Sequence, residues 1–143
     1  MKVSQLSVFI ENKSGRLADV TRTLAESDVN IRALSIADTI DYGLLRLIVN
    51  DPIRAKKTLM DAGFTVALTE VLAIEIPDKP GGLANIIDIL AGAGLNIEYM
   101  YAFVGTSGEN AIVVFRIERV DEAIATLQDK GVRILTGEEL HSL

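Results

Sequence analysis

The spacing of apolar residues changes several times along the chain, and each change predicts a new structural element. Leu6, Val8 and Ile10 recur at every second position, which is typical of a strand with one buried face. The spacing becomes helical over residues 14–27, where apolar side chains form one stripe. The rest of this half predicts strands at 31–37, 44–49 and 64–68, and a short helix between Pro52 and Gly63.

The second half of the chain repeats the first at a distance of 66 residues. The segment from Asn12 to Ala18 returns from Asp78 to Ala84, and the triplet ending at Ile31 returns ending at Ile97. Eight of the twenty residues from 12 to 31 are identical in the second copy, which is too many for segments that share only amphipathic patterning. Such a repeat indicates a duplicated structural unit whose functional surface occurs twice.

The second copy predicts the same six elements in the same order. Gly131 corresponds to Gly63 at a spacing of 68 residues instead of 66. We therefore place two extra residues in the loop at 105–108. The expected elements are strands at 71–76, 97–103, 111–117 and 132–135, and helices at 83–91 and 121–130. The order β-α-β-β-α-β predicts an α+β fold of two ferredoxin-like units, at 1–68 and 69–143, each with an antiparallel sheet and its helices on one face.

Composition removes several classes of function. The chain has no cysteine and a single histidine, His141, which excludes thiol catalysis and leaves no cluster for a metal; we expect no metal and no cofactor. The formal net charge of −6 opposes binding to nucleic acid. No apolar run approaches 18 residues and no leader precedes the first strand, so we expect a cytoplasmic protein that does not contact membranes.

The loop between the first strand and first helix of each copy carries the best candidate chemistry. Gly15 and Gly81 lead into a helix whose N-terminal N–H groups suit a carboxylate. Gly82 lies inside the first turn, where it destabilises the helix by about 1 kcal/mol relative to alanine, which favours close approach by a ligand. Asn12 or Asp78 can accept hydrogen bonds from an ammonium group. Turn punctuation and helix capping explain the same residues equally simply, and that alternative stays open.

The motif from Asp78 to Ala84, followed by an apolar helix and the segment from Gly94 to Ile97, resembles the signature of the ACT domain, a regulatory module that binds small molecules. The resemblance covers both copies. It implies that an amino acid binds where two units meet, at the first loop and at the asparagine that closes the first helix. Carried over, it implies these ligand-binding residues: Asn12, Ser14, Gly15, Arg16, Leu17, Asn30, Ile31, Asp78, Pro80, Gly81, Gly82, Leu83, Asn96 and Ile97.

The first copy departs from the ACT pattern. Ser14 stands where proline is usual, and Arg16 stands beside the glycine. Arg16 could hold a ligand carboxylate or remain solvated. The two sites therefore need not bind equally.

The sheet face away from the helices predicts a homodimer. An open sheet face is normally polar, yet this one is apolar, so we expect it to pack on a second chain. Its residues are Leu44, Ile48, Val71, Ala73, Ile112 and Val114.

The leading hypothesis is a non-enzymatic regulator that binds a free amino acid and signals allosterically to a partner, either an enzyme or another regulator. A small enzyme on a ferredoxin-like fold needs a nucleophile and base or an acid–base pair, and we find neither. A purely structural or interaction subunit is a further alternative. An RNA-binding sheet needs aromatic residues and a basic surface, which this chain lacks.

Overall fold

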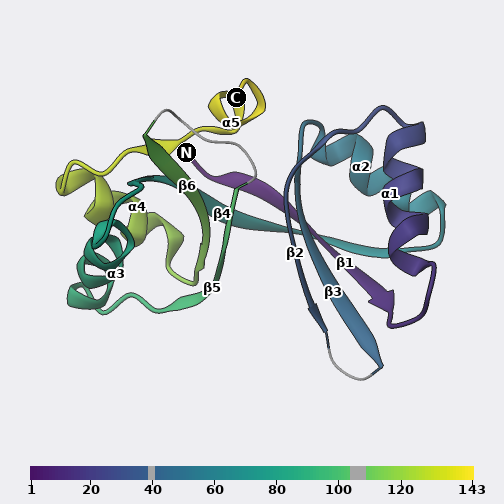
Figure 1. Cartoon of the computed structure of the whole chain (residues 1–143), viewed down its shortest axis with the longest axis horizontal. Coiled ribbons are helices and arrows are strands. Elements are labelled where there is room, and N and C mark those ends of the chain that lie inside the picture. The colour runs from purple at the N-terminus through teal and green to yellow at the C-terminus, as the bar shows by residue number, and fades with distance from the viewer. Residues whose placement is uncertain (39–40, 104–108) are drawn as a thin grey trace. The chain divides into compact units, whose positions relative to one another are not determined.

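The computed structural model describes residues 1–38, 41–103 and 109–143, and it divides them into two compact units (Figure 1). The first unit is Ser4–Thr69, and the second unit joins Met1–Val3 to Glu70–Leu143. Lys2 attaches the chain start to the second unit, since its Nζ lies 3.0 Å from Asp121 and 3.5 Å from Glu70. The two extra residues that we placed at 105–108 fall outside the described residues.

The first unit is a four-stranded antiparallel sheet with two helices on one face. Its strand order is β2-β3-β1-β4. Val20 and Leu24 of one helix and Leu59 of the other pack on the strand residues that alternation predicted to be buried. The elements are β1 (Val3–Glu11), α1 (Arg16–Glu26), β2 (Ile31–Asp38), β3 (Tyr42–Val49), α2 (Pro52–Asp61) and the start of β4 (Thr65–Pro77).

The second unit repeats this arrangement in the order β7-β4-β6-β5. Ile86 and Leu90 of its first helix and Leu127 of its second pack on the sheet around Phe115. Its elements are the rest of β4, α3 (Gly82–Gly92), β5 (Ile97–Ala102), β6 (Asn110–Ile117), α4 (Val120–Asp129), β7 (Ile134–Leu135) and α5 (Gly137–His141). Both units have the split β-α-β order, so the predicted α+β ferredoxin-like fold is confirmed.

Two elements differ from the sequence interpretation. The strands expected at 64–68 and 71–76 are one continuous strand, β4, because Thr69 and Glu70 between them contain no turn-forming residue. The short helix α5 was not predicted. It begins with a capping box in which Thr136 accepts from the N–H of Glu139 and the Glu139 carboxylate accepts from the N–H of Thr136. The pattern Thr-x-x-Glu at 136–139 is a sequence signal that could have revealed this helix.

Arg133 holds α5 against the sheet. Its guanidinium lies 2.9 Å from Glu75 on β4 and 2.5 Å from Glu139 on α5. The backbone N–H of Thr136, and after it the Arg133 guanidinium, lower the pKa of Glu139 below its ordinary value of 4.5. The charged form of Glu139 is therefore the form that stabilises the attachment of α5.

Acidification is expected to release α5 before the units unfold. Because the folded pKa of Glu139 is lowered, its contribution is present above pH 4.5 and is lost as the pH falls through the folded value. Amide hydrogen exchange of residues 137–141, followed from pH 7 to about pH 3, should show protection that decreases in this window. Glu139→Gln should show weaker protection at every pH and no such step. Protection that stays constant in the unaltered chain down to about pH 3 would contradict this account.

The homodimer expected from the open sheet face stays a prediction, although most residues of that face are buried in the single chain. Ile48, Val71, Ala73 and Val114 are fully buried and Ile112 nearly so within the one chain, which leaves only Leu44 partly exposed. The alternation in β1 also breaks, because both faces of the strand are covered. Gln5 and Ser7 are buried, and the Gln5 amide donates to the Ser7 hydroxyl at 3.2 Å. This face therefore gives no argument for a homodimer.

Candidate functional site

The two glycine loops have nearly identical backbone geometry. Gly15 and Gly81 occupy the N-cap positions of α1 and α3 with φ of +90° and +88°, a conformation that other residues adopt only with strain. The N–H of Lys13 donates to the carbonyl of Glu11 at 2.8 Å, and the matching bond from Lys79 measures 2.9 Å. A Cβ added at either glycine would meet nothing within 4 Å. Positive φ, and not crowding, therefore requires glycine at both positions.

Gly82 has a different reason to be glycine, and here the sequence interpretation is wrong. A Cβ at this position would lie 2.1 Å from the carbonyl oxygen of Pro77 and 3.2 Å from a methyl group of Ile76. The group that approaches Gly82 is thus the chain's own backbone at the end of β4, which does not require a ligand. The first unit has Arg16 at the matching position and accommodates its Cβ.

Each glycine loop borders a pocket, which we call the loop pocket. In the first unit the pocket has a volume of about 340 Å³ and is lined by Glu11, Asn12, Lys13, Asp41 and Tyr42. In the second unit it has a volume of about 430 Å³ and is lined by Pro77, Asp78, Lys79, Glu109 and Asn110. The same backbone bond closes both: the N–H of Asn12 donates to Asp41 at 3.0 Å and that of Asp78 to Glu109 at 3.1 Å. Each pocket therefore combines a lysine, two carboxylates and an asparagine.

The sequence interpretation found only one side of each loop pocket. It named Asn12 and Asp78 but missed the residues from the start of the third strand: Asp41, Tyr42, Glu109 and Asn110. The register brings them close, because Glu11 pairs with Tyr42 and Pro77 with Asn110. Strand order in a ferredoxin-like sheet is the signal that could have found them, since the third strand runs beside the first.

The charges of the loop pocket suit a zwitterion. In the first unit the Lys13 ammonium lies 2.7 Å from the Glu11 carboxylate, and this hydrogen bond lowers the pKa of Glu11. The carboxylates can accept from a ligand ammonium, and the lysine can pair with a ligand carboxylate. The same combination recurs in the second unit with Asp78, Lys79 and Glu109. Both charged ends of an amino acid thus have partners in each pocket.

The other candidate residues divide into two groups. Ser14 and Pro80 are exposed in the loops, and Leu17 and Leu83 lie in the first helical turns. Asn30, Ile31, Asn96 and Ile97 lie beyond the far ends of α1 and α3. Each helix has 11 residues, which places these two groups roughly 16 Å apart at 1.5 Å per residue. A single unit therefore does not bring the two groups together around one ligand.

Asn30 and Asn96 do not cap the helices that precede them, although capping is their simplest alternative role. The left-handed position after each helix is Asp28, with φ of 58°, or Gly94, with φ of 72°. The N–H of Val29 then donates to Leu24 at 2.9 Å, as in a Schellman motif. Asn30 instead pairs with Asn50 through its backbone, donating to the side-chain oxygen at 2.9 Å. The side chains of Asn30 and Asn96 both lie on the surface.

Arg16 is neither fully solvated nor directed into the loop pocket. Its guanidinium stands over the Phe64 ring, 4.9 Å from the centroid, and pairs with Asp19 at 3.5 Å. The Nε of Arg16 is buried without a hydrogen-bond partner among the described residues.

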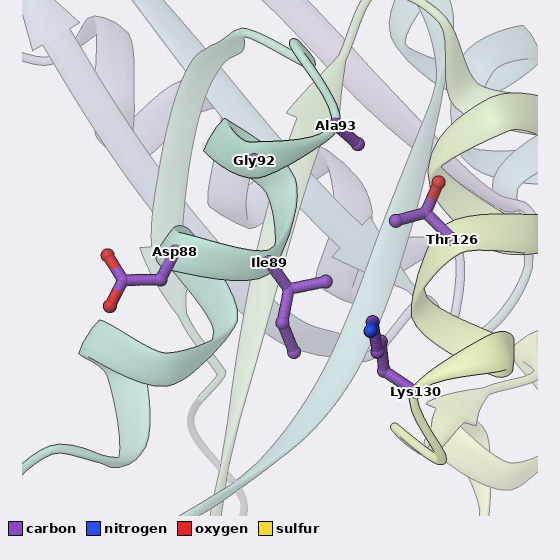
Figure 2. A pocket seen from close by; sticks show the side chains of 6 residues that line it. All are labelled: Asp88, Ile89, Gly92, Ala93, Thr126 and Lys130. Atoms are coloured by element: carbon purple, nitrogen blue, oxygen red, sulfur yellow. The ribbon is translucent and has the colours of Figure 1, made fainter.

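A further groove of about 430 Å³ lies between α3 and α4 (Figure 2). Ile89 from α3 faces Thr126 and Lys130 across it, while the carboxylate of Asp88 points away from the space between the helices. This groove presents a cation and apolar surface but no carboxylate directed inward. It is a poorer match to an amino acid than the loop pockets.

Two other kinds of site find no support in the part of the chain that the structure describes. No cluster of three or more histidine or acidic side chains gathers there in a way that could hold a metal ion. No helix within the described ranges is both long enough and apolar enough to span a membrane.

The fold and the duplicated loops define a pair of modules of the ACT type. The family model described as an ACT domain pair matches residues 1–143, so the chain belongs to this family, as the sequence motif indicated. No curated protein matches the chain.

Solved structures agree with this assignment. Protein BT0572 from Bacteroides thetaiotaomicron is 43% identical, with 100% of this chain and 98% of that chain covered and a TM-score of 0.94. The ligand-free regulatory subunit of aspartate kinase from Thermus thermophilus is 18% identical, with 88% and 90% covered and a TM-score of 0.62. The corresponding subunit from Thermus flavus is 21% identical, with 87% and 88% covered and the same TM-score. The likeness to the two kinase subunits concerns the fold alone.

Proposed function

We propose that this ACT domain pair binds a free amino acid in its loop pockets and acts as a non-catalytic regulator of a partner protein in the cytoplasm. The observation that carries the proposal is the loop pocket itself, which occurs twice with the same backbone bonds and the same set of charges. A chain that conserved only its core in both copies would not need a lysine and a carboxylate at matching places, as Lys13 and Lys79 are, and as Asp41 and Glu109 are.

The helix-end residues fit this function if a second copy of the chain completes each site. Asn30, Ile31, Asn96 and Ile97 lie too far from the loop pocket of their own unit to touch its ligand. In a homodimer they could supply the remaining contacts to the loop pocket of a neighbouring copy. The amino acid would then stabilise one packing of the units, and the partner would respond to that shift.

Regulation is favoured over catalysis by the chemistry of the pocket. The described residues of the loop pockets include no histidine and no cysteine, so neither pocket combines a nucleophile with a histidine base. Two structures with this fold are regulatory subunits of aspartate kinase, which is consistent with a regulated enzyme as partner.

Thermal unfolding in the presence of each of the twenty amino acids tests this function. A true ligand at 100 times its Kd should stabilise the fold by about 2.7 kcal/mol, which is several degrees in Tm for a chain of this size. Sedimentation of the same samples should show whether the ligand also promotes dimers. Failure of every amino acid to raise Tm at millimolar concentration would overturn the proposal.

A further inference from the structure

Each unit has a second pocket beside the loop pocket, which we call the side pocket. In the first unit it is formed chiefly by Phe9, Arg16, Tyr42 and Phe64 and has a volume of about 190 Å³. In the second unit it has a volume of about 300 Å³, and the lining residues include Glu75, Asn110, Lys130 and Arg133. The two pockets occupy matching places, because the end of the first strand, the start of the third strand and the turn before the last strand line both.

The side pocket adjoins the loop pocket in each unit. Glu11 and Tyr42 line both pockets of the first unit, and Pro77 and Asn110 line both pockets of the second. A ligand whose ammonium and carboxylate groups lie in the loop pocket can therefore extend its side chain into the side pocket. The lining of the side pocket would then select among amino acids.

The side pocket of the first unit presents planar aromatic surfaces. Phe9 and Tyr42 are 51% and 62% exposed, although large aromatic rings are normally buried, and Phe64 forms the buried wall. The Arg16 guanidinium lies over the Phe64 ring and adds a cationic planar surface. A cavity of about 150 Å³ suffices for benzene, so this pocket has room for one ring.

The second unit replaces each of these groups. Glu75 stands at the place of Phe9, Asn110 at that of Tyr42, and Gly82 at that of Arg16. The Glu75 carboxylate accepts from Asn110 at 3.2 Å and from Arg133 at 2.9 Å, so the polar groups are paired with one another. Inserting an aromatic ring would separate these charges from water and from each other, which is unfavourable.

We propose that the side pocket of the first unit is a specificity subsite for an aromatic side chain, and that the second unit does not share this preference. The proposal rests on the proposed function, since the loop pocket must first hold the amino-acid backbone. It makes the first unit the sensor of an aromatic amino acid. The difference between Arg16 and Gly82 is then part of a wider divergence of the side pockets.

Calorimetric titration of the full chain tests the proposal with matched ligands and matched variants. L-Phenylalanine should bind more tightly than L-cyclohexylalanine, which has a similar size but no aromatic ring. Phe9→Ala should weaken phenylalanine binding about two- to tenfold, as expected for loss of one aromatic pair, and should leave glycine binding unchanged. Leu34→Ala, which removes a 47% exposed side chain from β2 outside both pockets, is the control and should change neither.

The outcomes distinguish the aromatic subsite from the proposed binding of amino acids in the loop pockets. If amino acids bind but the chain does not distinguish the aromatic ring from the saturated one, the proposed subsite is wrong. The proposal that amino acids bind in the loop pocket is then unaffected. Equal weakening of glycine and phenylalanine by Phe9→Ala would also overturn the subsite. If no amino acid binds at all, the proposed function fails and the subsite fails with it. Since Phe9 is half exposed, thermal unfolding without ligand should show that the variant remains folded.

Discussion

Gly82→Ala is expected to lower the free energy of unfolding by about 1–3 kcal/mol, the range seen when an atom is forced into a packed site. The new methyl group would lie 2.1 Å from the Pro77 carbonyl oxygen, so the end of β4 or the first turn of α3 must shift. Intrinsic helix propensity predicts the opposite sign, because alanine is favoured over glycine by about 1 kcal/mol within a helix. The sign of the change therefore shows which effect dominates.

Chemical denaturation measures this change, and Gly92→Ala is its matched control. Gly92 ends the same helix, and a Cβ there would meet nothing within 4 Å. The control should be neutral or slightly stabilising. If Gly82→Ala proved as stable as the unaltered chain, the contact with Pro77 would not be the reason for glycine at this position.

Asp78→Asn should reduce the affinity of the second loop pocket for an amino acid by about tenfold or more. A hydrogen bond to a charged group contributes about 1.5–3 kcal/mol, and each 1.4 kcal/mol is a factor of ten. The substitution keeps the size of the side chain and removes only its charge, so an ammonium ligand loses one of its two ionic partners while the pocket keeps its shape.

Calorimetric titration of this variant should show a weakened class of sites beside the intact site of the first unit. Asp61→Asn is the control, because Asp61 is an exposed aspartate on α2 that pairs with Lys57 at 2.7 Å away from both loop pockets. Unchanged affinity in Asp78→Asn would remove Asp78 from the site. An equal loss in both variants would point to net charge as the cause.

Local patterns predicted the fold well because burial within each unit follows the local spacing of apolar residues. The period of two in β1 and the helical stripe of α1 reflect burial on the helix side, and Gly15 and Gly81 have the positive φ that their loops require. The family assignment followed from the same loop motif. The patterns failed where a residue is covered from both sides, as at Gln5 and Ser7, which no local alternation distinguishes from a polar outer face.

The site could be predicted only in part, because half of each loop pocket comes from residues about 30 positions further along the chain. Tyr42 reaches Glu11 through strand register, which depends on the whole sheet and not on either segment alone. The reason why position 82 is glycine also depends on tertiary structure. The atom that crowds it belongs to Pro77, and its place depends on the path of the loop. Sequence identified the loop, and tertiary structure was needed to identify what faces it.

The most direct test of amino-acid binding in the loop pockets is a titration of the labelled chain with the amino acid that raises Tm most, followed through backbone amide resonances. We expect the largest shifts at residues 11–16 and 78–82, together with 41–42 and 109–110, and little change at Ile89 and Thr126 in the groove between α3 and α4. Shifts confined to that groove, or a saturated titration that leaves both loops unperturbed, would contradict the account.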